Sequence, residues 1–220
     1  MINQLKQTNR FNISVLLLTM CVFSFGLSVF RFMVTDSPLF LFLNWNLFLA
    51  FIPWCISTLM IIKGANKNIS VALLIASWLL FFPNAPYILT DLFHLQYRSN
   101  KQTIWFDLIE ILSFAWTGLL FGLISLMDIE YLLQLRLKNK ITSALTTLFL
   151  FMSGFGIYLG RYLRWNSWDI IKNPLGLFSD IVERFINPMH HPRTWGMTIL
   201  MGILLNMMYY SLKILKAKTV

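Results

Sequence analysis

The sequence predicts an all-α integral membrane protein, a bundle of six transmembrane helices that forms a single domain over residues 1–220. Hydrophobic residues make up 57% of the chain and charged residues only 12%. That charged share is about half of what a soluble domain needs to cover its surface. The shortage is explained if lipid, rather than water, surrounds most of the protein.

Apolar blocks of suitable length support the same fold class. A helix needs about 20 residues to cross the hydrocarbon core of a bilayer. Six blocks near this length predict helices at residues 13–30, 39–62, 69–95, 105–127, 141–162 and 194–214. The first block lacks the cleavage pattern of a signal peptide and is longer than its apolar core, so we expect it to remain as a transmembrane helix.

The charges between the blocks predict an orientation. Placing successive loops on alternate sides puts ten of the 18 basic residues on the side that also holds both termini. The other side receives seven of the nine acidic residues and all three histidines. Because Lys and Arg are enriched in cytoplasmic loops, both termini are expected in the cytoplasm, with most carboxylates on the outer side.

The third block contains two prolines, Pro83 and Pro86, near its outer end. Each proline removes a backbone donor and disfavours α geometry in the residue before it. The third helix is therefore expected to break around Asn84. A broken helix at membrane depth is tolerated only where protein or a water-filled cavity satisfies the freed carbonyls, so this segment should face inward.

Polar residues follow this break and also begin the fourth block. Tyr87, Asp91 and His94 recur at α-helical spacing and are expected on one face. Asp107 and Glu110 start the fourth helix. They either begin a polar stripe or simply favour a helix N-terminus through its dipole.

The fifth block ends in two arginines, Arg161 and Arg164, with Trp168 marking the membrane boundary. Guanidinium groups at this depth are costly unless they are paired or extend toward water. In the same block, Gly156 and Gly160 form a G-x-x-x-G face that permits close approach of a neighbouring helix.

The following loop is the one sizeable segment outside the predicted spans. Asn173 and Pro174 are typical of a helix start, and Asn187 with Pro188 is typical of a helix end, which predicts a helix at residues 174–186. Its apolar residues recur on one face. This amphipathic helix either lies on the outer membrane surface or packs its apolar face on the other helices as a lid.

Two strings in the chain are too unusual for chance to explain. Residues 81–95 read FFPNAPYILTDLFHL, and residues 160–174 read GRYLRWNSWDIIKNP. They resemble the signature segments of a family of uncharacterised bacterial membrane proteins, the domain of unknown function thirteen sixty-one. The resemblance implies a multi-helix protein of the cell envelope, in the bacterial cytoplasmic (inner) membrane. Since the family has no established activity, the resemblance assigns no catalytic residue.

Other features limit the cofactors and partners. Cys21 and Cys55 lie in separate apolar blocks without metal-ligand spacing, so we expect neither a metal nor another cofactor. The basic residues fall singly between apolar blocks instead of forming a nucleic-acid-binding patch. Membrane lipids are the expected partners. A protein partner or a second copy of the chain would use the apolar helix faces.

The polar residues of the outer side form a candidate site. Asp91 or His94 would act as the general base, while Arg161 and Arg164 would hold phosphate or carboxylate. This hypothesis describes an enzyme acting on a lipid-linked or phosphorylated envelope substrate. A structural ion-pair cluster in an accessory or assembly subunit is the main alternative, and a small transporter is another. Further substrate-binding candidates are Asn84, Tyr87, Asn166, Trp168 and Asp169.

The predicted orientation is testable by cysteine labelling after Cys21 and Cys55 have been replaced. A cysteine at Ser99 should react with a membrane-impermeant thiol reagent in intact cells, because that loop is expected outside. A cysteine at Asn139 should react only after permeabilisation. Labelling of the Asn139 variant in intact cells would reverse the orientation.

Overall fold

The computed structural model describes residues 10–63, 68–97 and 104–218, and helices are the only regular elements within these ranges. Six helices in this part of the chain are long and apolar enough to cross a membrane, which confirms the all-α, six-span prediction. The chain divides into two compact units, residues 1–132 and 133–220. Unit 1 contains the first four spans and unit 2 the last two.

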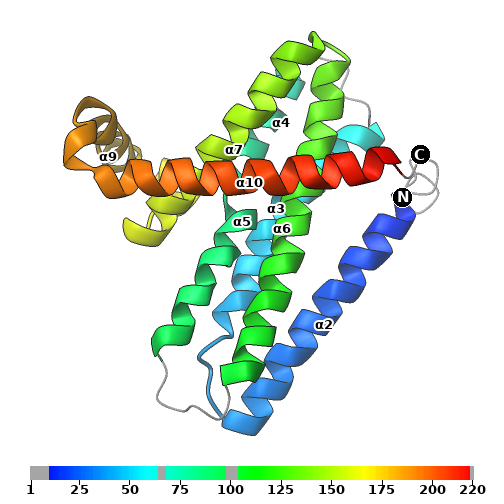
Figure 1. Cartoon of the computed structure of the whole chain (residues 1–220), viewed down its shortest axis with the longest axis vertical. Coiled ribbons are helices and arrows are strands. Elements are labelled where there is room, and N and C mark those ends of the chain that lie inside the picture. Colours follow the sequence, from blue (N-terminus) through cyan, green and yellow to red (C-terminus); the bar gives the residue numbers. More distant parts are fainter. Residues whose placement is uncertain (1–9, 64–67, 98–103, 219–220) are drawn as a thin grey trace. The chain divides into compact units, whose positions relative to one another are not determined.

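Unit 1 runs alternately down and up through four spans, which can be followed from blue to green in Figure 1. The helices begin at or near the predicted residues and mostly extend further than the predicted blocks. The third span is divided into three helical segments. The elements are α2 (Phe11–Thr35), α3 (Phe42–Lys63), α4 (Asn68–Phe81), α5 (Asn84–Tyr87), η1 (Ile88–Tyr97) and α6 (Ile104–Gln134).

The break in the third span occurs at the two prolines, as predicted. Regular α-helix ends at Phe81, and the amide of Ala85 donates to the carbonyl of Phe82, three residues back, at 3.1 Å. The side-chain amide of Asn84 donates to the carbonyl of Phe81 at 2.9 Å. Both carbonyls near the missing amide of Pro86 are therefore satisfied. From Ile88 onward the span continues as a 3₁₀-helix.

Close backbone contact in unit 1 occurs where α6 crosses α5. A Cβ added at Gly122 would lie 2.8 Å from the Cβ of Ala85, and one at Gly118 would lie 3.1 Å from the carbonyl oxygen of Ala85. Small residues matter here because lipid is as apolar as a leucine side chain, so packing in a membrane depends on close van der Waals contact. This G-x-x-x-G pair positions the broken third span.

Unit 2 is an antiparallel pair of spans, α7 (Asn139–Tyr162) and α10 (Pro192–Lys218). A Cβ added at Gly154 would lie 2.7 Å from the carbonyl oxygen of Thr198. Nearer the other end of the pair, Thr147 and Tyr210 share a hydrogen bond of 3.0 Å. Gly154 thus provides the close contact. Gly156 and Gly160 are half-buried, and their predicted packing role stays a prediction.

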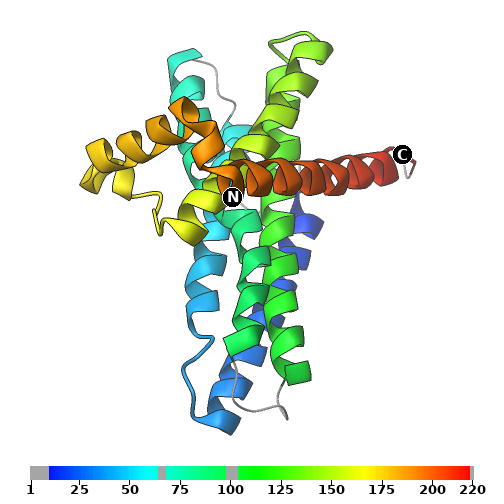
Figure 2. The same cartoon turned by 60° about the vertical axis from the view of Figure 1, so that its left-hand side comes forward.

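Three short helices connect α7 to α10, shown in yellow and orange in Figure 2. They are α8 (Asp169–Lys172), α9 (Pro174–Ile186) and η3 (Pro188–His190). The bounds of α9 agree with the predicted helix at residues 174–186. Asn173 caps it as expected, since its side-chain oxygen accepts the amide hydrogen of Gly176 at 3.1 Å.

Replacing Gly122 with alanine should lower the thermal stability of the detergent-solubilised protein. The added methyl group would overpack the α5–α6 contact, which typically costs about 1–3 kcal/mol. The matched control is Gly26→Ala, because a Cβ at Gly26 meets nothing within 4 Å. That change should be neutral or stabilising, since alanine favours helices by up to about 1 kcal/mol over glycine. Equal melting temperatures for the two variants would argue against the α5–α6 contact.

Candidate functional site

The 3₁₀ geometry of η1 changes which side chains share a face. With three residues per turn, Asp91 and His94 lie one above the other. Tyr87 lies four residues before Asp91, about a third of a turn away at three residues per turn. The expectation that Tyr87 shares the face of Asp91 and His94 is therefore wrong, because it assumed α-helical periodicity.

Asp91 lies at the interface between η1 and α3 and is completely buried. The side-chain amide of Asn46, on α3, donates to Oδ2 of Asp91 at 2.8 Å. One turn further, the rings of Phe42 and His94 lie 4.8 Å apart. Four residues of an α-helix rise about 6 Å, as do three residues of a 3₁₀-helix. The two helices can therefore pair at both positions.

His94 is oriented by Asp91. Nδ1 of His94 lies 3.1 Å from the carbonyl oxygen of Asp91 and 3.8 Å from its Oδ1. When Nδ1 of His94 carries the proton and donates it in a hydrogen bond to Asp91, Nε2 is the basic nitrogen of the ring. The imidazole is 31% exposed, whereas the carboxylate is 1% exposed. The pair thus combines a buried carboxylate with an accessible imidazole.

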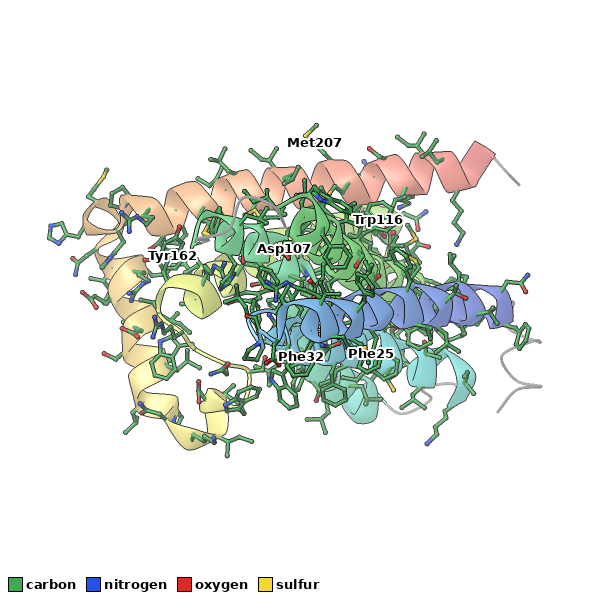
Figure 3. All side chains as sticks on the ribbon, turned by 90° about the horizontal axis from the view of Figure 1, so that it is seen from below. Phe25, Phe32, Asp107, Trp116, Tyr162 and Met207 are labelled. Carbon is green, nitrogen blue, oxygen red and sulfur yellow. The ribbon has the colours of Figure 1, made fainter. Side chains whose placement is uncertain are left out.

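A second charged cluster lies at the same end of unit 1. Nε of Arg31, on α2, donates to Oδ1 of Asp107 at 2.7 Å and lies 3.6 Å from Oε2 of Glu110. Both carboxylates are completely buried, and Figure 3 shows Asp107 among the helices. These residues therefore do more than favour a helix N-terminus. Within the described residues, no group of three His, Cys, Asp or Glu side chains is suited to a metal ion.

Aromatic rings connect the two clusters. The guanidinium of Arg31 lies 4.6 Å from the ring centre of Phe40, and the ring of Phe40 lies 6.3 Å from that of Phe42. Phe42 in turn contacts His94. The ion cluster and the Asp91–His94 pair thus form one continuous layer of polar and aromatic side chains.

The opposite end of unit 1 contains a separate ion pair. Arg10, immediately before α2, binds Asp128 on α6 and also donates to the hydroxyl of Thr58 on α3. Ser57 donates to Oδ2 of Asp128 at 2.7 Å. Since Arg31 binds α6 near the other end, charged contacts hold both ends of α2 against the other helices of unit 1.

Sequence patterns did not identify Arg31 and Asn46 as members of the site. A usable signal existed for Arg31, since it is the only charged residue in the 25 residues of α2. An ionisable group in a span usually faces the bundle interior and has a partner. Asn46 offers no comparable signal, because its role depends on the pairing of α3 with η1.

The remaining candidates of the third span, Asn84 and Tyr87, take part in hydrogen bonds within the broken segment. Asn84 donates to the carbonyl of Phe81, as described above. The carbonyl of Tyr87 accepts the hydroxyl hydrogen of Thr90 at 2.7 Å. These contacts stabilise the broken segment, and a role for either residue in substrate binding stays a prediction.

The candidates of unit 2 lie between the last turn of α7 and the first residue of α8. Arg161 and Trp168 are half-buried. Arg164 is exposed and has a positive φ of 60°. The backbone and side-chain amides of Asn166 donate to Oδ2 of Asp169 at 2.7 and 3.3 Å, so these two residues stabilise the turn itself. The predicted joint action of Asp91 with the arginines, which belong to the other unit, stays a prediction.

Comparison with known proteins identifies a family but no function. A family model described as "Protein of unknown function (DUF1361)" matches residues 45–208. The match begins after α2, so Arg31 lies outside the matched region and Asn46 inside it. No curated protein and no solved structure matches the chain.

Replacing Arg31 with glutamine should strongly destabilise the protein. Removing one partner of a buried ion pair leaves the other charge uncompensated, which costs about 3–5 kcal/mol. The measurement is the loss of folded protein on heating in detergent, compared with Arg136→Gln, where the same change affects an exposed side chain. If both variants melt together, the Arg31 cluster does not stabilise unit 1.

Proposed function

We propose an enzymatic function for this chain, which belongs to the family described as "Protein of unknown function (DUF1361)". The proposal rests on the chemistry of the chain's own residues. This integral membrane protein is an enzyme that acts on a lipid-linked or phosphorylated substrate. Proton transfer takes place at His94, and the carboxylate of Asp91 supports it. The geometry of this pair is the single observation that carries the proposal.

The pair has the arrangement of an oriented general base. Asn46 fixes one oxygen of the Asp91 carboxylate, and the other oxygen lies on the side of His94. When Nε2 of His94 accepts a proton from a substrate hydroxyl or water, the buried carboxylate stabilises the imidazolium that forms. Partial exposure of the ring gives a substrate group access to it.

The arginines of unit 2 supply anion binding in this proposal. Arg161 lies in the last turn of a span and Arg164 lies just after it. A guanidinium donates two parallel hydrogen bonds to a phosphate or carboxylate, whereas an ammonium group does not. Lipid-linked substrates carry such a group at the membrane surface.

The location is part of the same proposal. The distribution of basic residues supports cytoplasmic termini and an outer position for His94. The family resemblance supports the bacterial inner membrane. An accessory or assembly subunit would share this location but would need no oriented base.

The test is lipid conversion by the purified protein in nanodiscs that contain the total lipid extract of the source cells. Mass spectrometry should show one anionic lipid class consumed by the wild type. His94→Gln and Asp91→Asn should each slow this conversion by about 100-fold or more, the usual contribution of a general base. Arg164→Lys should raise the half-saturating lipid concentration.

The matched controls carry the same substitutions at exposed or loop positions, His190→Gln and Asp36→Asn. Both should retain the wild-type rate. An unchanged lipid spectrum with the wild-type protein would reject the enzymatic proposal and favour the accessory subunit. Full activity of a folded His94→Gln protein would remove His94 from the mechanism.

A further inference from the structure

Unit 2 exposes a group of large apolar side chains on the segment between its two spans. Exposed fractions of 66% to 90% are found for Ile171, Leu175, Phe178, Ile186 and Met189. Exposure of so many large apolar side chains to water would be unfavourable, so the set marks a surface for another apolar phase. We call this set the apolar platform.

The ends of the segment determine which phase the platform meets. It leaves the membrane where α7 ends at Tyr162 and re-enters where α10 begins at Pro192. Because α7 and α10 are antiparallel neighbours, these two points lie at the same surface. The rings of Phe155 and Trp195, 6.1 Å apart, confirm this side-by-side arrangement. The 29 residues between are therefore confined to one membrane surface.

Polar contacts fix the rotational orientation of α9 about its own axis. Oδ2 of Asp180 accepts a hydrogen bond from the indole of Trp165 at 2.7 Å. Arg184 is buried, and its guanidinium lies 5.9 Å from the ring centre of Tyr158. The indole of Trp195 donates to the carbonyl of Arg184 at 3.3 Å. The charged face of α9 thus points toward α7 and α10.

The apolar face of α9 is wider than the part of it that packs against other residues of unit 2. Leu177 and Ile181 are half-buried at the edge of this face nearest those residues. Leu175, Phe178 and Ile186 extend beyond that contact and are exposed. A lid would bury these side chains against the other helices, whereas an interfacial helix presents them to lipid.

An aromatic stack anchors this arrangement on the last turn of α7. The rings of Tyr158 and Tyr162 are stacked 5.2 Å apart, and the guanidinium of Arg193 lies 5.6 Å from the ring centre of Tyr162. Arg184 covers the other end of the stack at Tyr158. Cation–π contacts gain strength where water is excluded, as at a membrane boundary.

The charges of the segment favour an anionic lipid surface. Three basic and three acidic residues lie between Arg161 and Arg193, and these two arginines flank the segment at the ends of the two spans. Each acid has a partner within unit 2: Asp169 binds Asn166, Asp180 binds Trp165, and Glu183 lies 3.5 Å from His191. The exposed basic residues can therefore face lipid phosphates.

We propose that the segment from α8 to η3 inserts its apolar platform into the membrane. The platform side chains lie at the boundary between the headgroups and the acyl chains of one anionic leaflet. None of the platform residues belongs to the Asp91–His94 pair, so this inference stands apart from the proposed enzymatic activity.

Nitroxide spin labels test the platform in the full-length protein, reconstituted into vesicles of phosphatidylcholine and phosphatidylglycerol. Cysteines replace Phe178 and Ser179 one at a time, in a background that lacks Cys21 and Cys55. Ser179 is the matched control because it is exposed and adjacent on the same helix. The Phe178 label should collide several-fold more with oxygen, relative to a water-soluble nickel chelate, than the Ser179 label.

Two results at Phe178 would overturn the platform. Preference for the nickel chelate would place the apolar face in water. Protection from both reagents would show that protein covers the face, either as a lid or in a second copy of the chain. Vesicles of phosphatidylcholine alone test the role of lipid charge, since the oxygen preference of the Phe178 label should be lower in them than in vesicles with phosphatidylglycerol. Lys172→Gln should make the oxygen preferences in the two kinds of vesicle more similar. Equal values in both lipids would overturn the anionic part of the inference.

Discussion

Pro86 has no amide hydrogen to offer the carbonyl of Phe82, and the geometry of the third span follows from this lack. Inside a membrane no water can satisfy a freed carbonyl, so the protein must do it. Ala85 bonds to Phe82 three residues back, and the side chain of Asn84 bonds to Phe81. One short α-helical turn, Asn84–Tyr87, follows the break, and from Ile88 the chain continues as a 3₁₀-helix. The side chains from Ile88 onward therefore follow a 3₁₀ register instead of an α-helical one.

The change of helix type is what brings the candidate base into position. A 3₁₀-helix places Asp91 and His94 on one face with a rise that matches one turn of α3. Asn46 and Phe42 meet these two residues in turn. Continuous α-helix would turn His94 away from Phe42 by about 20° for every residue after Tyr87. The proline pair, the small-residue contact with α6 and the Asn46–Asp91 hydrogen bond thus belong to one arrangement.

Composition and periodicity predicted the six spans, the break at the prolines and the bounds of α9, because each depends on local sequence. Pairing across long separations was not predictable in this way. Arg31 binds Asp107, 76 residues away, and no local pattern identifies that partner. The 3₁₀ form of η1 and the roll of α9 also depend on neighbouring helices. Helical spacing alone therefore grouped Tyr87 incorrectly with Asp91 and His94.

Disulfide cross-linking between α3 and η1 tests the central claim most directly, in a protein whose native cysteines have been replaced. One cysteine is placed at Asn46 or at Phe42, and the second is moved through positions 90–95. The 3₁₀ register predicts the highest yields for position 46 with 91 and for position 42 with 94, so the two maxima lie three residues apart. Maxima four residues apart would show a continuous α-helix and contradict the account.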